Sequence, residues 1–204
     1  MNMKNLLTPL AFVLISICSV NGQTSFGVKG GVNVSYMNID MRESLVSFHA
    51  GVFSRIALSD QAFLQPELLY SIKGAKFPEY FYPFDMNFTF DYISMPILFG
   101  WKATKNFSIM AGPEISYLVD AQLEVGEYGP DGTDGFSTWD LCVDLGVAYQ
   151  ITKGLGVDLR FGYGLVDVVN ILFTDANGQT VAVFNEGRNR TIQLGVNYKV
   201  KSEE

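Results

Sequence analysis

The chain is poor in charged residues for its length of 204 residues. Lysine, arginine, aspartate and glutamate make up 17% of it, against about 25% in an average soluble domain. Hydrophobic residues make up 48%, which excludes an intrinsically disordered chain, because such chains combine low hydrophobicity with high charge. The formal net charge of −7 argues against nucleic acid as a partner, since nucleic-acid-binding proteins present a basic face.

Cysteine and long apolar runs are also scarce. The two cysteines are Cys18 and Cys142, and Cys18 lies in an N-terminal segment that we expect to be removed. A mature chain with a single thiol forms no intrachain disulfide. Beyond that segment no apolar run reaches the length of about 20 residues that a membrane-spanning helix requires, so a bundle of membrane helices is excluded.

The N-terminal segment has the pattern of a secretory signal peptide. Lys4 supplies a positive start, an apolar stretch follows over 6–20, and the small residue Gly22 precedes a cleavage point at Gln23. We therefore expect residues 1–22 to be a cleaved signal peptide and residues 23–204 to form one exported domain.

A two-residue period dominates the rest of the chain. Over 139–151, 155–165 and 191–200 every residue of one face is apolar, whereas the other face is mostly charged, polar or small. Such alternation is typical of β-strands with two unlike faces. Followed along the chain, it predicts eight strands, near 25–37, 46–58, 62–75, 88–102, 106–121, 138–151, 155–168 and 188–200.

The connections between these strands alternate in length. Residues 59–61, 103–105 and 152–154 are short turns, and the other connections, near 39–45, 76–87, 122–137 and 169–187, are long. An even number of strands with tight turns at one end and long loops at the other is typical of outer-membrane barrels. The sequence therefore predicts an all-β fold: an eight-stranded antiparallel up-and-down transmembrane β-barrel. It would lie in the lipid bilayer of the cell outer membrane with both termini in the periplasm.

A soluble sandwich or lipocalin-like barrel alternates in the same way, with its apolar face inward. Aromatic spacing favours the membrane instead, because pairs of aromatic residues lie ten positions apart on the apolar face. Ten residues in a strand tilted by about 40° span about 25 Å, the height of the lipid-facing band between two aromatic girdles. The pairs are Phe26 and Tyr36, Phe107 and Tyr117, and Trp139 and Tyr149.

The polar face carries charges on most of the predicted strands. An eight-stranded barrel is just wide enough for side chains to fill its interior, so we expect these charges to pair and plug the lumen, leaving no open path for ions. The expected set comprises the cations Lys29, Arg55, Lys73, Arg160 and Lys199 and the carboxylates Glu67, Glu114, Asp144 and Asp158, with Asp120 and Asp140 nearer the outer rim.

Residues with the pattern of a catalytic, cofactor or metal site are lacking. His49 is the only histidine, and a lone histidine on a lumenal face is more often a hydrogen-bonded filler than a base. The sequence has no Gly-x-Ser-x-Gly, HExxH or P-loop pattern. The acidic, glycine-rich stretch 124–135 lacks EF-hand spacing. We expect no enzymatic activity, no catalytic residue, no cofactor and no metal, and we interpret Cys142 as a small filler.

Two of the long loops have unusual sequences. The segment 77–84, FPEYFYPF, is rich in aromatic residues, which we expect to pack over the barrel mouth or, as the alternative, to meet a partner. The pair Asn177-Gly178 between two apolar runs predicts a β-hairpin. We expect this hairpin to continue the last two barrel strands above the membrane.

Four short segments resemble a known family. They are FGVKGGVN at 26–33, QPELLYSIKG at 65–74, YISMPILF at 92–99 and GPEISYLV at 112–119. With these segments the chain resembles the PorT-like family of small outer-membrane β-barrel proteins, often labelled "porin family". The chain departs from the family at Ser94, where relatives often carry a carboxylate or amide, and at its end, which lacks the terminal aromatic that barrel-assembly machinery commonly reads.

The functional expectation is a non-enzymatic outer-membrane barrel with a structural or interaction role through its extracellular loops. The resemblance implies a place in an envelope or secretion assembly, with partners from that assembly and from the barrel-assembly machinery during insertion. The alternative is an outer-membrane enzyme, a small-ligand carrier or a narrow porin.

Overall fold

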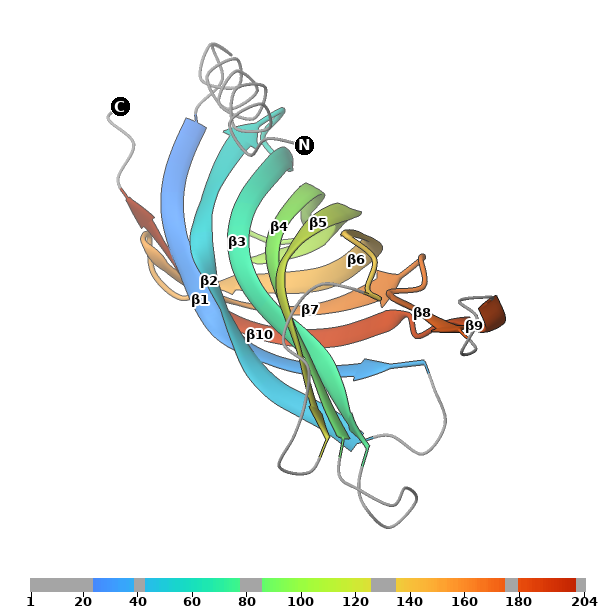
Figure 1. Cartoon of the computed structure of the whole chain (residues 1–204). Helices are drawn as coiled ribbons and strands as arrows, with labels where there is room; N and C mark the ends of the chain where they lie inside the picture. Colours follow the sequence, from blue (N-terminus) through green and yellow to red (C-terminus); the bar gives the residue numbers. More distant parts are fainter. Residues whose placement is uncertain (1–23, 39–42, 78–85, 126–134, 175–179, 201–204) are drawn as a thin grey trace.

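A computed structural model describes residues 24–38, 43–77, 86–125, 135–174 and 180–200. Eight strands close into an antiparallel barrel in the order β1-β10-β7-β6-β5-β4-β3-β2, and two further strands, β8 and β9, form a separate sheet (Figure 1). The barrel strands are β1 (Thr24–Met37), β2 (Glu43–Ala57), β3 (Ala62–Phe77), β4 (Met86–Lys102), β5 (Phe107–Val125), β6 (Trp139–Gln150), β7 (Leu155–Gly164) and β10 (Asn189–Val200); the small sheet is β8 (Val169–Thr174) with β9 (Thr180–Glu186).

The first and last strands close the barrel. β1 pairs with β10 from Phe26 opposite Val200 to Met37 opposite Asn189. Every barrel strand therefore has two hydrogen-bonded neighbours, and no strand edge of the wall is left to pair with another chain. The predicted eight-stranded up-and-down barrel is confirmed.

The three short connections share the same side-chain-to-backbone hydrogen bond. In each, a hydroxyl oxygen of the turn accepts a hydrogen bond from the backbone N–H three residues later, at 3.0 Å: Ser59 from Ala62, Thr104 from Phe107 and Thr152 from Leu155. Such side-chain bonds replace backbone bonds where the chain reverses. We call this end of the barrel, where β1 begins and β10 ends, the short-turn end.

The other end differs from the sequence prediction in two ways. The seventh strand ends at Gly164 and not at residue 168, because Val168 and Val169 leave the wall and are buried over the lumen. The predicted hairpin is present as β8 and β9, but these strands form a separate two-stranded sheet and do not continue the last two barrel strands. In Figure 1 it lies at the end of the barrel opposite the start of β1.

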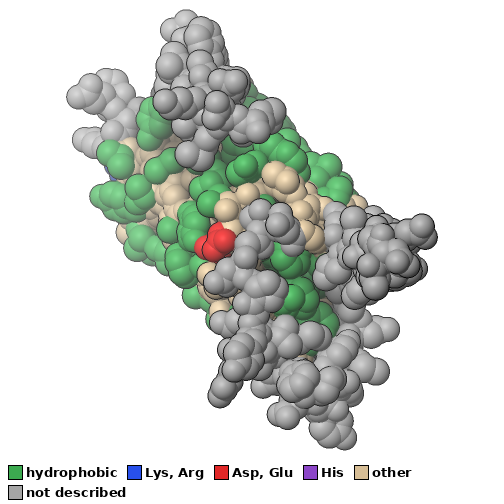
Figure 2. Space-filling model, viewed as in Figure 1, with side chains coloured by type: hydrophobic (Ala, Val, Ile, Leu, Met, Phe, Trp, Pro, Cys, Tyr) green, Lys and Arg blue, Asp and Glu red, His purple; other side chains and the backbone are tan. Residues whose placement is uncertain are grey.

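The outer face of the wall is apolar, as predicted. Leu145, Leu159 and Leu194, from three adjacent strands, are each about half exposed on it, and Figure 2 shows hydrophobic side chains covering most of the visible wall. Aromatic residues mark both ends of the stretch over which β5 and β6 pair. The rings of Tyr117 and Trp139 meet edge to face at 5.1 Å, whereas Phe107 pairs with Tyr149 in register at the short-turn end.

The interior has three layers along the barrel axis. Near the long loops lies the mouth cluster, an apolar group comprising Met37, Ala75, Phe77, Phe90, Tyr92, Leu118, Ala121, Val168 and Val169, with Phe88 and Phe136 packed against it. Near the short turns lies the floor cluster, comprising Phe63, Leu98, Met110 and Ala148. Buried polar and charged side chains occupy the level between them.

Glycine makes room for the floor cluster. A Cβ atom built on Gly100 would lie 2.1 Å from the ring of Phe63, a distance that only an absent side chain allows. The Phe63 ring therefore lies against the backbone of the neighbouring strand.

Candidate functional site

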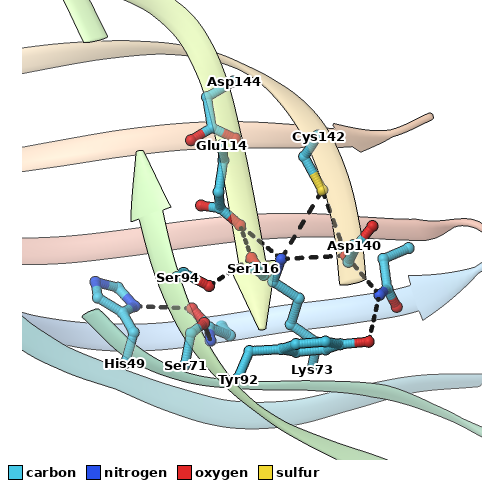
Figure 3. A network of polar contacts seen from close by, with 12 residues as sticks. His49, Ser71, Lys73, Tyr92, Ser94, Glu114, Ser116, Asp140, Cys142 and Asp144 are labelled. Atoms are coloured by element: carbon cyan, nitrogen blue, oxygen red, sulfur yellow. Dashed lines mark hydrogen bonds and ion pairs between the residues drawn. The ribbon is translucent and has the colours of Figure 1, made fainter. Parts of the chain in front are cut away.

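Lys73 is the centre of one half of the polar layer. It extends from β3, and its Nζ atom donates to Glu114 Oε1 at 2.6 Å and to Asp140 Oδ2 at 3.5 Å. The ammonium also lies 5.2 Å from the centre of the Tyr92 ring. Figure 3 shows these groups converging from β3, β4, β5 and β6. Lys73 thus links strands that are not its neighbours in the wall.

Asp140 belongs to this cluster, although it is only the second residue of β6. Its side chain is fully buried and accepts from Asn189 Nδ2 at 2.9 Å and from the Cys142 thiol at 3.5 Å. Asp140 lies nearer the long-loop end than Glu114 and Asp144, as expected, but the sequence did not predict that its side chain joins the ion-pair network. Cys142 is buried within the same contacts, as a small side chain between charged ones.

The second half of the polar layer is built on Arg160. Its guanidinium donates to Glu67 Oε1 at 2.8 Å and to Asp144 Oδ2 at 3.4 Å. Lys29 lies between Glu67, at 3.4 Å, and Asp158, at 3.0 Å. All five of these side chains are nearly inaccessible to solvent. The predicted pairing of lumenal charges is present here.

The composition of this ion-pair network differs from the expected near balance. Three cations face five carboxylates among the described residues, because Asp140 joins the network while Arg55 and Lys199 lie outside it at the short-turn mouth. Buried carboxylates without enough cations need other hydrogen-bond donors.

Neutral side chains supply those donors. One amide or hydroxyl donates to each of four carboxylates: Gln65 to Glu67, Ser116 to Glu114, Asn189 to Asp140 and Asn197 to Asp158. The sequence prediction considered only charged residues and therefore missed these four. Their place on the inward face of their strands could have identified them.

His49 has the surroundings of a structural histidine. It is buried on β2, and its Nδ1 atom lies 2.7 Å from Asn33 Oδ1. The Asn33 amide in turn donates to Ser71 Oγ at 3.1 Å. No carboxylate or serine bonds to His49 directly within the described residues, so the nucleophile, base and orienting group of a hydrolase are not assembled there.

The remaining candidate residues lie apart from the network. Asp120 stands opposite Asp91 in the wall, and Asp91 accepts from the Tyr70 hydroxyl. Among the described residues, no group of three or more histidine, cysteine or acidic side chains is arranged to hold a metal. Residues 78–84 of the aromatic segment 77–84 and most of the acidic stretch 124–135 lie outside the described residues.

A closed eight-stranded wall, an apolar outer face and a charged, filled lumen point to one class of protein. Residues 20–170 match the family model described as "Outer membrane protein beta-barrel domain". The chain belongs to this family. It is therefore a transmembrane β-barrel that lies in the lipid bilayer of the outer membrane. No described helix is long and apolar enough to cross a membrane.

Solved structures agree with this fold at low sequence identity. The barrel is similar to Neisserial surface protein A, with 16% identity, a TM-score of 0.52, and coverage of 87% of this chain and 97% of that one. A weaker similarity is found with Ail of Yersinia pestis, with 12% identity, a TM-score of 0.49, and coverage of 88% of this chain and 99% of that one. OprG of Pseudomonas aeruginosa has 12% identity and a TM-score of 0.44, with 88% of this chain and 97% of that one covered. No characterised protein sequence matches the chain.

Proposed function

We propose that this outer-membrane barrel is non-enzymatic and acts through its long-loop end, as a structural or interaction component of an envelope or secretion assembly of the PorT-like kind. In this proposal residues 1–22 are a signal peptide removed on export. Both termini and the short turns face the periplasm, and the long loops and the β8–β9 hairpin face the outside.

The single observation that supports this proposal is the three-layered filling of the lumen. The ion-pair network occupies the middle, and an apolar cluster packs against it on either side. A barrel of this kind offers no water-filled path for a solute and no substrate cleft between its charges. Its variable part is then the set of loops, which are where barrel proteins carry their specific contacts.

The long-loop end carries a feature suited to such contacts. β8 and β9 form a hairpin that is not part of the wall, and it is joined to the barrel by Val168 and Val169, which are buried in the mouth cluster. An isolated bridge links Val169 to Phe136 of the preceding loop. The hairpin is thus anchored to the barrel at its base.

Deletion of the hairpin tests the proposal. A variant that lacks residues 171–184, closed by a short glycine-serine link, keeps Val168, Val169 and the whole wall. Affinity capture from crosslinked outer membranes would compare it with the full chain, and a variant with the hairpin apolar residues shuffled serves as a length-matched control. We expect a discrete envelope protein to crosslink to the full chain and to neither variant, while heat-modifiable gel mobility shows that all three barrels fold.

The alternative class gives opposite results. A narrow porin or small-ligand carrier would swell proteoliposomes in the presence of small sugars or amino acids, and deletion of the hairpin would leave that transport intact. If the same proteins crosslinked to the barrel with and without the hairpin, the hairpin would not be the part of the molecule that binds a partner.

A further inference from the structure

The short-turn end contains a cavity lined by unpaired cations. It has a volume of about 210 Å³ and lies between the ends of β2, β4, β5, β6 and β10. Four of the ten residues that line it are cationic, namely Arg55, Lys102, Lys105 and Lys199, and none is acidic. A protein of net charge −7 with only 14 lysines and arginines thus places four of them around one opening.

The bonds of these cations go to neutral groups. Arg55 Nε donates to Gln65 Oε1 at 2.8 Å, and its guanidinium lies 4.3 Å from the centre of the Phe63 ring. Lys102 Nζ donates to the backbone oxygen of Asp60 at 3.1 Å. None of the four cations forms an ion pair with a described residue.

The lumenal carboxylates form no ion pair with the four cations, although Glu67 and Asp158 attract the Arg55 guanidinium from a longer distance. The floor cluster borders the cavity, since Ala148 belongs to both. The two carboxylates on the network side, Glu67 and Asp158, are bound by Gln65 and Asn197 and by the network's own cations. Like charges that share an opening repel one another, and an anion bound among them removes that repulsion.

The geometry points to a binding site for a phosphoryl anion in this cavity. A guanidinium and three ammonium groups supply charge-assisted hydrogen bonds, which suit the several oxygens of a phosphate better than a single carboxylate. Asn106, Ser108 and Gln150 add neutral donors to the same lining. The cavity also has room beyond one small ion, because its volume equals that of several waters.

The position of the cavity is compatible with two kinds of ligand that carry a phosphoryl group. Tyr149 lines it and is also half exposed on the lipid-facing side of the wall, at the level where interfacial aromatics meet lipid headgroups. The source is therefore either the headgroup of an anionic phospholipid in the adjacent leaflet or a soluble phosphorylated compound. Which of the two leaflets lies next to the short-turn end depends on the proposed orientation, in which the short turns face the periplasm; the binding site itself does not depend on it.

The first measurement uses inorganic pyrophosphate as the probe. Isothermal titration of the full barrel in an uncharged detergent should show one site per chain. The Lys102→Gln/Lys105→Gln variant should weaken its affinity by at least about tenfold, because two charge-assisted contacts are lost. Lys153→Gln is the matched control: Lys153 is an exposed lysine of another short turn that does not line the cavity.

The second measurement reads lipid contact at this end of the barrel. The chain has two tryptophans; Trp101 precedes Lys102 and faces lipid, whereas Trp139 lies at the opposite end. In a Trp139→Phe background, Trp101 fluorescence is followed in vesicles that contain brominated phosphatidylglycerol or brominated phosphatidylcholine. Stronger quenching by phosphatidylglycerol, abolished by Lys102→Gln/Lys105→Gln and kept in Lys153→Gln, identifies the lipid as the source.

The two arms together decide the proposal. Pyrophosphate binding without a preference for phosphatidylglycerol identifies a soluble phosphate compound as the source. Absence of both, or equal losses in Lys153→Gln, overturns the site. Binding that appears only after Glu203→Gln/Glu204→Gln also overturns it, because the cavity would then hold the chain's own C-terminal carboxylates. Each of these outcomes is independent of the hairpin deletion that tests the proposed function.

Discussion

Asp158 and Leu159 are neighbours in β7 that the structure places on opposite sides of the wall. Asp158 is buried in the lumen, 3.0 Å from Lys29 and hydrogen-bonded to Asn197, whereas Leu159 is about half exposed on the outer face. Substitutions at these two positions therefore report on two different environments, lumen and lipid, from adjacent residues of one strand.

Leu159→Arg should destabilise the barrel by about 2–4 kcal/mol, because an arginine near the bilayer midplane has neither water nor a partner. Leu159→Ala is the matched control, which removes bulk without adding charge and should cost less. Urea unfolding in lipid vesicles, followed by tryptophan fluorescence, measures both free energies of unfolding. Equal stability of Leu159→Arg and the unmodified chain would refute the assignment of this face to lipid.

Asp158→Ala should cost about 3–5 kcal/mol for a different reason, since it leaves Lys29 buried with only the longer contact to Glu67. Lys29→Met combined with Asp158→Ala removes both charges and should cost less than the sum of the single changes. Asp158→Asn keeps an acceptor for Asn197 and separates that hydrogen bond from the charge. If Asp158→Ala were neutral while Leu159→Arg was severe, the wall assignment would stand and the stabilising ion-pair network would not.

Three further predictions concern the whole barrel. Cell fractionation should recover the protein in the detergent-extractable outer membrane with heat-modifiable gel mobility; a soluble periplasmic monomer would contradict the barrel in lipid. Purified protein in planar bilayers should show no large, stable channel, and reproducible nanosiemens-scale openings would show that the lumen is not closed. The Cys142 thiol, buried beside Lys73 and Asp140, should resist maleimide labelling in the folded barrel and react after urea unfolding, as followed by mass spectrometry; rapid labelling of the folded form would place water in the polar layer.

The wall of the barrel could be predicted from the sequence because its determinants are local. The alternation at Leu155, Val157 and Leu159 requires only that one face meets lipid, and each hydroxyl-containing short turn is complete within four residues. Strand ends were less accurate: the strand was predicted to reach residue 168, but the chain leaves the wall after Gly164. The alternation itself breaks there, since Asp167 falls at an outward position and Val166 and Val168 at inward ones. The burial of Val168 over the mouth is a property of the assembled barrel and cannot be read from the strand period.

The lumenal contacts could be predicted as a class but not as pairs. The sequence places Lys73 and Glu114 on inward faces, and only the register of three successive strands brings them within 2.6 Å. Arg55 and Lys199 also face inward, yet they lie too close to the short turns to reach the network. The two-residue period of a strand predicts which side of the wall a side chain occupies. Its position along the barrel axis depends on the offsets between neighbouring strands, which add up around the wall.

The position of β3 in the ion-pair network has a consequence for the order in which the barrel is assembled. Glu67 and Lys73 lie on one face of this strand, but neither forms an ion pair with β2 or β4, its neighbours in the wall. Their ion-pair partners come from β1, β5, β6 and β7. Except for Lys29 of β1, these partners lie in strands that follow β3 in the chain, so neither charge is fully paired until β5, β6 and β7 are in place. Water then leaves the lumen only as the wall closes. Closure and dehydration become a single event, so a partly closed barrel has no stable interior. Loss of Arg160 in β7 would remove the shorter ion pair of Glu67 in β3, on the far side of the molecule.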